Sequence, residues 1–133
     1  MRTIDLELDT TGRELVDLTD DVRDFCRDAG DGLLNVFVPH ATAGLAILEL
    51  GDNSEPDFAE LLERLLPKDD RYHHHHGSPG HGADHLLPTL ISPSLVLPVV
   101  AGVPQLGTWQ HVVLVDRNAD NPSRRVRMSL LEG

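Results

Sequence analysis

The sequence predicts an α+β fold: a single domain over residues 1–133, with mostly antiparallel, β-sandwich-like sheets and two to three helices. Three observations support this prediction. A chain of 133 residues suits one compact domain with a core. About seven segments have the composition or alternation of strands, and fewer have helical periodicity. The last strands follow one another through turns rather than helices, which favours antiparallel pairing.

The chain is expected to begin with two strands and a helix. Residues 3–8 alternate polar and apolar side chains, which indicates a half-buried strand, and residues 14–18 form a second strand after a turn. Thr19 is expected to be the N-cap of a helix with acidic residues in its first turn, where the helix dipole favours them. Gly30 would end this helix.

Two more strands and a second helix follow. Residues 33–38 form a strong strand pattern, and residues 44–48 are apolar throughout, which predicts a central strand buried on both faces. Ser54 is expected to cap a helix whose apolar face extends from Phe58 to Leu66.

The second half of the chain is expected to be richer in strands. A short helix lies within residues 83–91, where Pro88 makes it irregular or late-starting. Three strands are predicted after it, at residues 95–100, 111–115 and 125–130. Pro98 fits the first of these only at a sheet edge or a bulge.

Composition excludes several classes of protein. The formal net charge of -11 argues against a general nucleic-acid binder, although the basic segment 124–127 could bind phosphate locally. Cys26 is the single cysteine, so no internal disulfide is possible, and its place in a helix favours packing over reactivity. The chain has no run of 18 apolar residues and no signal-like N-terminus. We therefore expect a cytoplasmic protein without a membrane partner.

Six of the eight histidines lie within residues 72–85. Glycines and a proline make this stretch a long polar loop, and such loops are usually functional or disordered. Imidazole is a good ligand for zinc and other transition metals. The spacing matches no standard zinc motif, so a histidine tag and a solvated loop remain as alternatives. The second alternative is the more plausible for a single member such as His75 or His76.

A second group of polar residues is expected at one sheet edge. His40 and Thr42 follow a strand end, and Glu49 and Asp52 leave the next strand. A histidine with two carboxylates can ligate a metal or act as a general acid and base. Taken alone, the two carboxylates are more typical of an ordinary acidic surface.

Two further segments have both a structural and a functional interpretation. Trp109 is either an anchor in the core or an interface, or it marks a segment whose Gln110 amide faces a ligand. Arg124 and Arg125 precede the last strand, where they form either a solvated pair or a phosphate-binding pair, because arginine binds phosphate with two hydrogen bonds.

Several of these segments, taken together and in order, resemble the YjbQ-like family. The resemblance rests on residues 40–45 with Glu49 and Asp52, on Pro67 followed by Tyr72-His73-His74, on His85, on residues 94–99 and on Gly107-Thr108-Trp109-Gln110. It covers nearly the whole chain. Members of this family are often described as secondary thiamine-phosphate synthases.

The resemblance implies a homotrimer with sites near subunit interfaces and a divalent metal, zinc or magnesium. By position, the metal ligands would be His40, His74 and His85, and the catalytic residues Glu49 and Asp52. Substrate or phosphate would be bound by Thr42, Gln110, Arg124 and Arg125. The chain departs from the family at Leu48 and Gly82, where asparagine is usual, and in a shortened loop before Asp57. The remaining histidines of the loop match no family motif: His73, His75, His76 and His81.

The resemblance implies a transferase that joins a pyrimidine pyrophosphate to a thiazole phosphate and releases pyrophosphate. Such a reaction needs cations around the leaving group, from Mg²⁺ or arginine. The first alternative is a metal-dependent hydrolase of a small phosphorylated metabolite, in which Glu49 or Asp52 acts as base on a water. The second is a metal-binding or ligand-binding trimer without catalysis.

Overall fold

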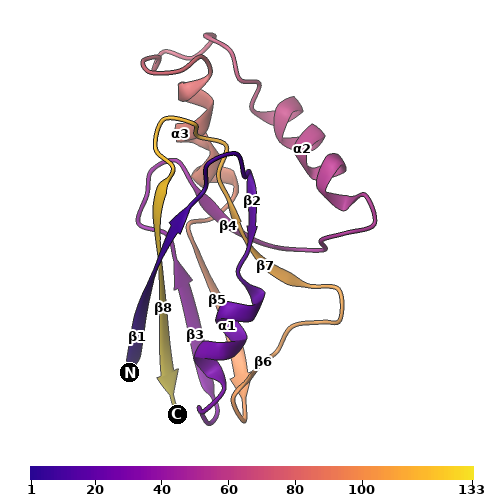
Figure 1. Cartoon of the computed structure of the whole chain (residues 1–133), viewed down its shortest axis with the longest axis vertical. Coiled ribbons are helices and arrows are strands. Elements are labelled where there is room, and N and C mark those ends of the chain that lie inside the picture. The colour runs from indigo at the N-terminus through magenta and orange to yellow at the C-terminus, as the bar shows by residue number, and fades with distance from the viewer.

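Two antiparallel sheets and three helices make up the computed structural model, which describes residues 1–133 and confirms the α+β fold (Figure 1). The strands are β1 (Arg2–Asp9), β2 (Leu15–Asp17), β3 (Gly32–Phe37), β4 (Gly44–Leu48), β5 (Ser94–Val100), β6 (Val103–Pro104), β7 (His111–Val115) and β8 (Ser123–Glu132). The helices are α1 (Thr19–Cys26), α2 (Ser54–Leu65) and α3 (His81–Leu90). No helix is both long enough and apolar enough to cross a bilayer.

The two sheets pack face to face over the main core. The larger sheet has the order β1-β8-β3-β5-β6 and the smaller one the order β2-β7-β4. Leu34 lies opposite Leu97 on one side and Leu130 on the other, so these three side chains share the inner face of the larger sheet. They join Val112 and Leu114 of β7 in one buried cluster. This packing fits the predicted β-sandwich-like arrangement.

Strand β7 is the strand that is buried on both faces. Val113 and Val115 point away from the main core and pack against Leu62 of α2 and Leu87 of α3. The sequence places this role on residues 44–48, and that prediction is wrong, because β4 is an edge strand of the smaller sheet and Ile47 is 38% exposed. Both strands are apolar, and their composition does not show which of them has neighbours on either side.

The helix starts differ from the sequence prediction by one or two residues. Thr19 and Ser54 are the first residues of their helices rather than N-caps. The Thr19 hydroxyl instead donates to Asp17 and accepts a hydrogen bond from the Val112 backbone, which ties α1 to β7. Helix α3 begins at His81, two residues earlier than expected, and this start brings an additional histidine into the helix.

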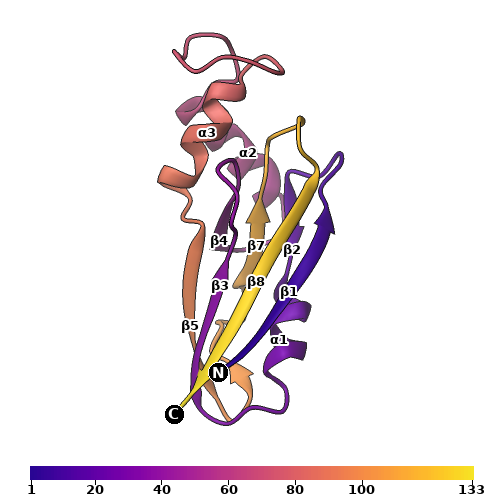
Figure 2. The same cartoon turned by 90° about the vertical axis from the view of Figure 1, so that its left-hand side faces the viewer.

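The histidine-rich loop lies at one end of the molecule. It joins α2 to α3 at the top of Figure 1, while both chain termini lie together at the opposite end (Figure 2). Pro98 lies on β5, and β6 pairs with only Val99 and Val100 of that strand. The Pro98 carbonyl accepts a hydrogen bond from the Gln105 N–H, just beyond β6, so the nitrogen that lacks a hydrogen faces the outer edge of the sheet rather than β3.

Candidate metal centre

Three histidines from the loop and α3 converge on one point. His74 comes from the loop, and His81 and His85 lie one turn apart on the same face of α3. Their ligand nitrogens all lie within 4.8 Å of one another. The two Nε2 atoms of His81 and His85 are 2.8 Å apart, and the His74 and His85 rings lie 4.4 Å apart between centroids. We call these three residues the histidine trio.

Two glycines allow the loop to approach the helix closely enough to form the trio. A Cβ atom at Gly82 would lie 2.6 Å from the Cβ atom of Tyr72 and would also clash with the His74 backbone. Gly80 has a φ of 81° and faces Lys68, whose Cα atom would be 2.6 Å from an added Cβ. Any larger residue at position 82 would therefore push the backbone of His74 away from α3.

Asp120 orients the His81 ring. Its Oδ2 atom lies 2.8 Å from His81 Nδ1 and also accepts hydrogen bonds from the backbone N–H and the hydroxyl of Ser78. The Ser78 backbone N–H is the main cause that lowers the pKa of Asp120, so the carboxylate is charged and can only accept. Nδ1 of His81 must then donate, which leaves the lone pair of Nε2 pointing at the trio.

Replacing Asp120 with asparagine is expected to weaken divalent-metal binding by about 10- to 100-fold, because an amide no longer fixes the tautomer of His81. Competition with a chromogenic chelator would measure this affinity in both proteins. Thermal unfolding of the metal-free variant provides the control for folding. An affinity equal to that of the wild type would show that Asp120 does not position a ligand.

A buried polar network holds together the segments that surround the trio. Asp84 lies in α3 with 2% of its side chain exposed and binds Lys68 Nζ at 2.7 and 2.9 Å. Lys68 also donates to the carbonyl of Arg117, and Asn118 donates to Asp84. These bonds join the loop after α2, helix α3 and the loop between β7 and β8, so the three segments that surround the trio are held together.

The electrostatic environment keeps His85 ready to bind a metal. Burial is the main cause that lowers its pKa, and the neighbouring rings of His74 and His81 lower it further. His85 is therefore neutral at neutral pH, and the neutral imidazole is the form that ligates metals.

His40 lies outside the trio. Its Nε2 atom accepts a hydrogen bond of 3.0 Å from the Arg125 backbone N–H, and it belongs to no group of converging metal ligands. Of the three predicted metal ligands, the single chain therefore brings His74 and His85 together and holds His40 in a different polar cluster. The centre of that cluster is Arg124, which donates to Thr42 Oγ1 at 2.7 Å.

The remaining predicted site residues are also apart from the trio. Glu49 and Asp52 are exposed between β4 and α2, and Gln110 accepts a hydrogen bond from the Gly107 N–H within its own loop. Arg125 is exposed and pairs with Glu7 at 3.2 Å. Trp109 is 70% exposed, so it is not a core anchor within the chain.

Comparison with known proteins supports the resemblance of these segments. The family model described as UPF0047 protein YjbQ-like matches residues 3–133. This chain belongs to that family. It is 61% identical over 133 residues to UPF0047 protein Rv2556c of Mycobacterium tuberculosis, with 100% of both chains covered. It is 29% identical over 136 residues to UPF0047 protein YjbQ of Escherichia coli, covering 97% of this chain and 95% of that protein.

Solved structures have the same YjbQ-like architecture. Hypothetical protein APE1520 of Aeropyrum pernix K1 is 32% identical and superposes with a TM-score of 0.87 over 100% of both chains. The YbjQ-like protein of unknown function SSO2532 of Sulfolobus solfataricus P2 has a TM-score of 0.90 at 24% identity, covering 99% of this chain and 97% of that one. The second likeness concerns the fold alone.

His81 is the trio member that sequence reasoning missed. It matches no YjbQ-like motif, but its spacing of four residues from His85 is a signal, because residues four apart share one face of a helix. The signal is readable only if the helix starts at or before His81. The departure at Gly82 also gains a reason, since asparagine at that position would collide with the loop.

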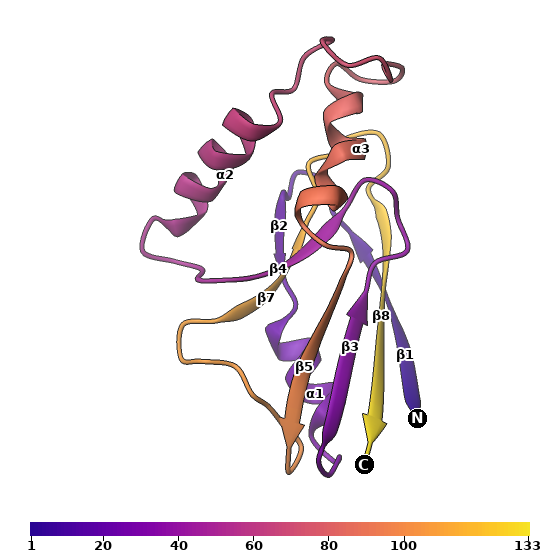
Figure 3. The same ribbon diagram turned by 180° about the vertical axis from the view of Figure 1, so that it is seen from behind.

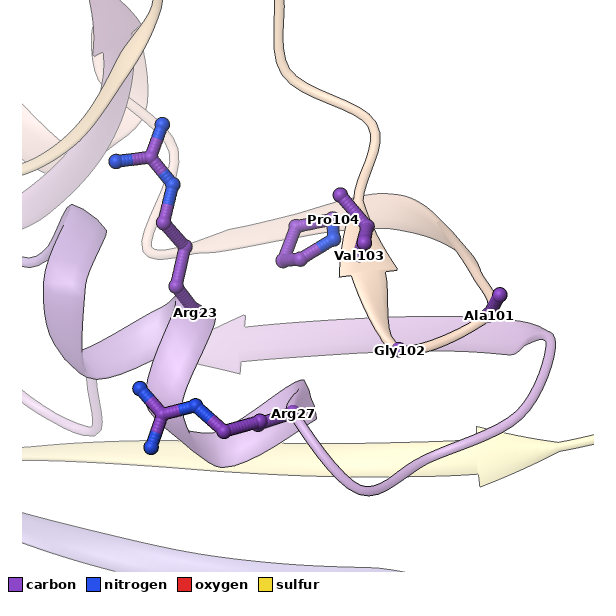
Figure 4. Close-up of a pocket in the computed structure, with 6 residues that line it drawn as sticks. All are labelled: Arg23, Arg27, Ala101, Gly102, Val103 and Pro104. Carbon is purple, nitrogen blue, oxygen red and sulfur yellow. The ribbon is translucent and has the colours of Figure 1, made fainter.

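A hollow of about 430 Å³ opens beside the trio. Its lining residues are Arg71, Tyr72, His73, His74, Gly82, His85 and Leu86. Another hollow, of about 250 Å³, lies at the opposite end of the molecule between α1 and the turn before β6 (Figure 4). In Figure 4 its two arginines extend away from that turn, and each is paired with an aspartate of α1. Only the first hollow combines an open space with converging metal ligands.

The pH dependence of stability is expected to reflect His40. Burial is the main cause that lowers the pKa of this residue, and the charge of Arg124 adds to it. The unfolded chain therefore binds more protons, so the free energy of unfolding falls as pH decreases below about 6.5 and is unaffected by His40 above that value. Protonation would also turn Nε2 from an acceptor into a donor and break its bond with Arg125.

Urea unfolding of metal-free protein between about pH 7.5 and pH 5.5 would measure this effect. The His40→Gln variant can keep an acceptor for the Arg125 N–H, because its amide oxygen can occupy the Nε2 position, but it does not titrate, so its stability should fall less over the same interval. Equal losses in the two proteins would contradict the assignment to His40.

Proposed function

We propose that the histidine trio holds a divalent transition metal, zinc by preference, and that the protein hydrolyses a small phosphorylated metabolite with its help. The observation that supports this proposal is the convergence of three imidazoles beside an open hollow. Catalytic zinc sites typically have three protein ligands and one open position, and three histidines are a known set. Magnesium prefers oxygen ligands, so the trio fits zinc better.

The surroundings of the trio also fit a resident metal. Two of its three rings have a defined environment: His81 is oriented by a charged carboxylate, and burial lowers the pKa of His85 so that the ring is neutral. A carboxylate bonded to the far nitrogen of a histidine ligand is the usual outer partner in zinc proteins. When bound, zinc supplies a Lewis acid that activates water near neutral pH.

The hollow offers a substrate both a cationic and an apolar wall. Arg71 lines it with a guanidinium that is exposed and held by Asp69 through bonds of 2.8 Å. Tyr72 donates its hydroxyl to the Pro67 carbonyl, which fixes its ring as part of the wall, and Leu86 adds apolar surface. Guanidinium groups bind phosphate well. In this proposal Arg71 attracts the phosphoryl group in a chain that is otherwise strongly acidic.

The proposal includes self-association as a homotrimer. Leu33, Val96 and Leu131 are each more than half exposed on the outer face of the larger sheet. No helix crosses this face (Figure 3). Exposed apolar patches often mark interaction surfaces. Glu49 and Asp52 do not belong to the group of converging ligands. In this proposal, a catalytic role for them therefore depends on assembly bringing them to the trio of a neighbouring copy.

The first experiment uses protein purified without a tag or a nickel column. We expect about one zinc per chain and hydrolysis of p-nitrophenyl phosphate that stops with a chelator and returns with zinc but not with magnesium. Protein that binds no transition metal and hydrolyses no phosphomonoester after zinc addition would overturn the proposal. Light scattering tests the proposed homotrimer, which the mass of a monomer would contradict. The proposal also places the protein in the cytoplasm, and cell fractionation tests this location.

Thiamine-phosphate synthesis is a second candidate, and it rests on the resemblance of the sequence motifs, since the matched family is described without an activity. In this reaction the trio metal and Arg71, the arginine that lines the hollow, would stabilise the departing pyrophosphate. Purified protein would be mixed with the pyrimidine pyrophosphate and the thiazole phosphate, and released pyrophosphate measured. If no pyrophosphate forms and overexpression does not rescue a thiamine-auxotrophic strain, this candidate is excluded. The hydrolase proposal is tested separately, by the hydrolysis of p-nitrophenyl phosphate.

A further inference from the structure

A fourth histidine lies against the trio from the loop side. The ring of His76 is 4.5 Å from that of His74 and 4.5 Å from that of His81, measured between centroids, and 6.5 Å from that of His85. Its ligand atoms are not part of the group that lies within 4.8 Å. His76 therefore sits next to the position of the metal without completing the ligand set.

The backbone on both sides of His76 is fixed to the centre. His74, two residues earlier, belongs to the trio. Ser78, two residues later, donates from its backbone and its hydroxyl to Asp120, which is also the partner of His81. A segment held at both ends by the same site cannot move far, so the His76 side chain stays within reach of the metal position.

His76 nevertheless has a freedom that the two trio members on α3, His81 and His85, lack. Its side chain is exposed, and no hydrogen bond holds its ring, in contrast to His81. It also lines a separate open hollow of about 370 Å³ with Asp70 and residues 75 and 77–79. Because His76 both neighbours the trio rings and lines this hollow, a rotation about its own side-chain torsions would turn the ring toward one or the other.

We propose that His76 is a displaceable fourth ligand of the trio metal. Turned inward, it would add a fourth imidazole to the three of the trio, and four protein ligands make up the closed arrangement typical of structural zinc. Turned toward its own hollow, it leaves the fourth position to water or to the phosphoryl group of a substrate. The inference rests on the proposed metal centre and adds control over when its fourth position is open.

X-ray absorption at the zinc edge tests this inference, because it counts imidazole ligands. We expect four imidazoles in the zinc-loaded wild type and three in the His76→Ala variant, with affinity for zinc lowered by about 10-fold or more. The His73→Ala variant is the matched control, since it removes a histidine of the same run whose ring contacts no trio ring. It should retain four imidazoles and the wild-type affinity.

The same measurement in saturating inorganic phosphate tests displacement. The wild type should fall from four imidazoles to three, while the His76→Ala variant should stay at three. A wild-type count of three without phosphate, or of four with it, would overturn the inference, as would an equal loss in the His73→Ala variant. A wild type that binds no zinc would instead remove the proposed function itself. Thermal unfolding of each metal-free variant shows whether a lost ligand reflects the site rather than the fold.

Discussion

Replacing Asp116 with alanine is expected to destabilise the folded chain by about 3–5 kcal/mol, because it would leave the buried charge of Arg124 without a partner. The two side chains are 1% and 0% exposed, and Arg124 Nε donates to Asp116 Oδ2 at 2.6 Å. Asp116 also accepts hydrogen bonds from the Thr10 hydroxyl and the Asn118 backbone N–H. One substitution would therefore leave several buried donors unsatisfied.

Urea unfolding measures this loss, and an exposed ion pair provides the matched control. Glu7 pairs with Arg125, the next residue along the chain, at 3.2 Å on the surface. The Glu7→Ala variant should lose no more than about 1 kcal/mol. A double variant, Asp116→Leu with Arg124→Met, should be more stable than Asp116→Ala, since it removes the unpaired charge. Similar losses of unfolding free energy in Asp116→Ala and Glu7→Ala would show that breaking the buried pair costs no more stability than breaking the exposed one.

This pair also bears on the predicted phosphate role of Arg124. Its guanidinium already bonds Asp116 and the Thr42 hydroxyl, and 1% of the side chain is exposed. In this conformation the arginine joins β8 to the turn before β4 and to the end of β7. Phosphate binding by Arg124 stays a prediction, and it would require opening this buried network.

Replacing His81 with alanine is expected to lower zinc affinity by more than the Asp120 substitution does, and hence by more than about 100-fold. The variant loses a ligand rather than only the group that orients it. It also removes the ring that lies 2.8 Å, between Nε2 atoms, from His85. Chelator competition measures the affinity, and the hydrolysis of p-nitrophenyl phosphate should fall in parallel.

The His73→Ala variant again separates the trio from the histidine run. Both positions lie in or beside the same loop, but His73 is exposed and outside the trio. Similar affinities of the two variants would mean that the run chelates metal without a defined site. Because His81 is buried, thermal unfolding of its metal-free variant must first show a folded protein.

Most of the fold was predictable because strands and helices have periodic sequence patterns. The strands at residues 33–38, 95–100 and 111–115 correspond to β3, β5 and β7 within one or two residues. Which of β4 and β7 is the central strand of their sheet was not predictable, because both are continuous apolar runs. Which of two such strands lies in the middle depends on partners far away in the chain.

The candidate site was predictable in part. His74 and His85 follow from the resemblance, and the structure brings them together. His40 follows from the same resemblance, but within the chain its nitrogen binds the Arg125 backbone, a contact between residues 85 positions apart. His81 depends on where α3 begins, and that start is set by Gly80 and by the network below the helix rather than by a capping side chain.

The close approach of the histidine-rich loop to α3 at Gly82 has a consequence for sequence variation among relatives. Here the loop backbone and the helix share space that even one additional carbon would occupy. A relative with a bulkier residue at this position must route its loop farther from the helix, and its histidine at position 74 would then face a different part of the surface. Glycine at 82 should therefore mark the branch of the family in which the histidine at position 74 joins the centre in this way.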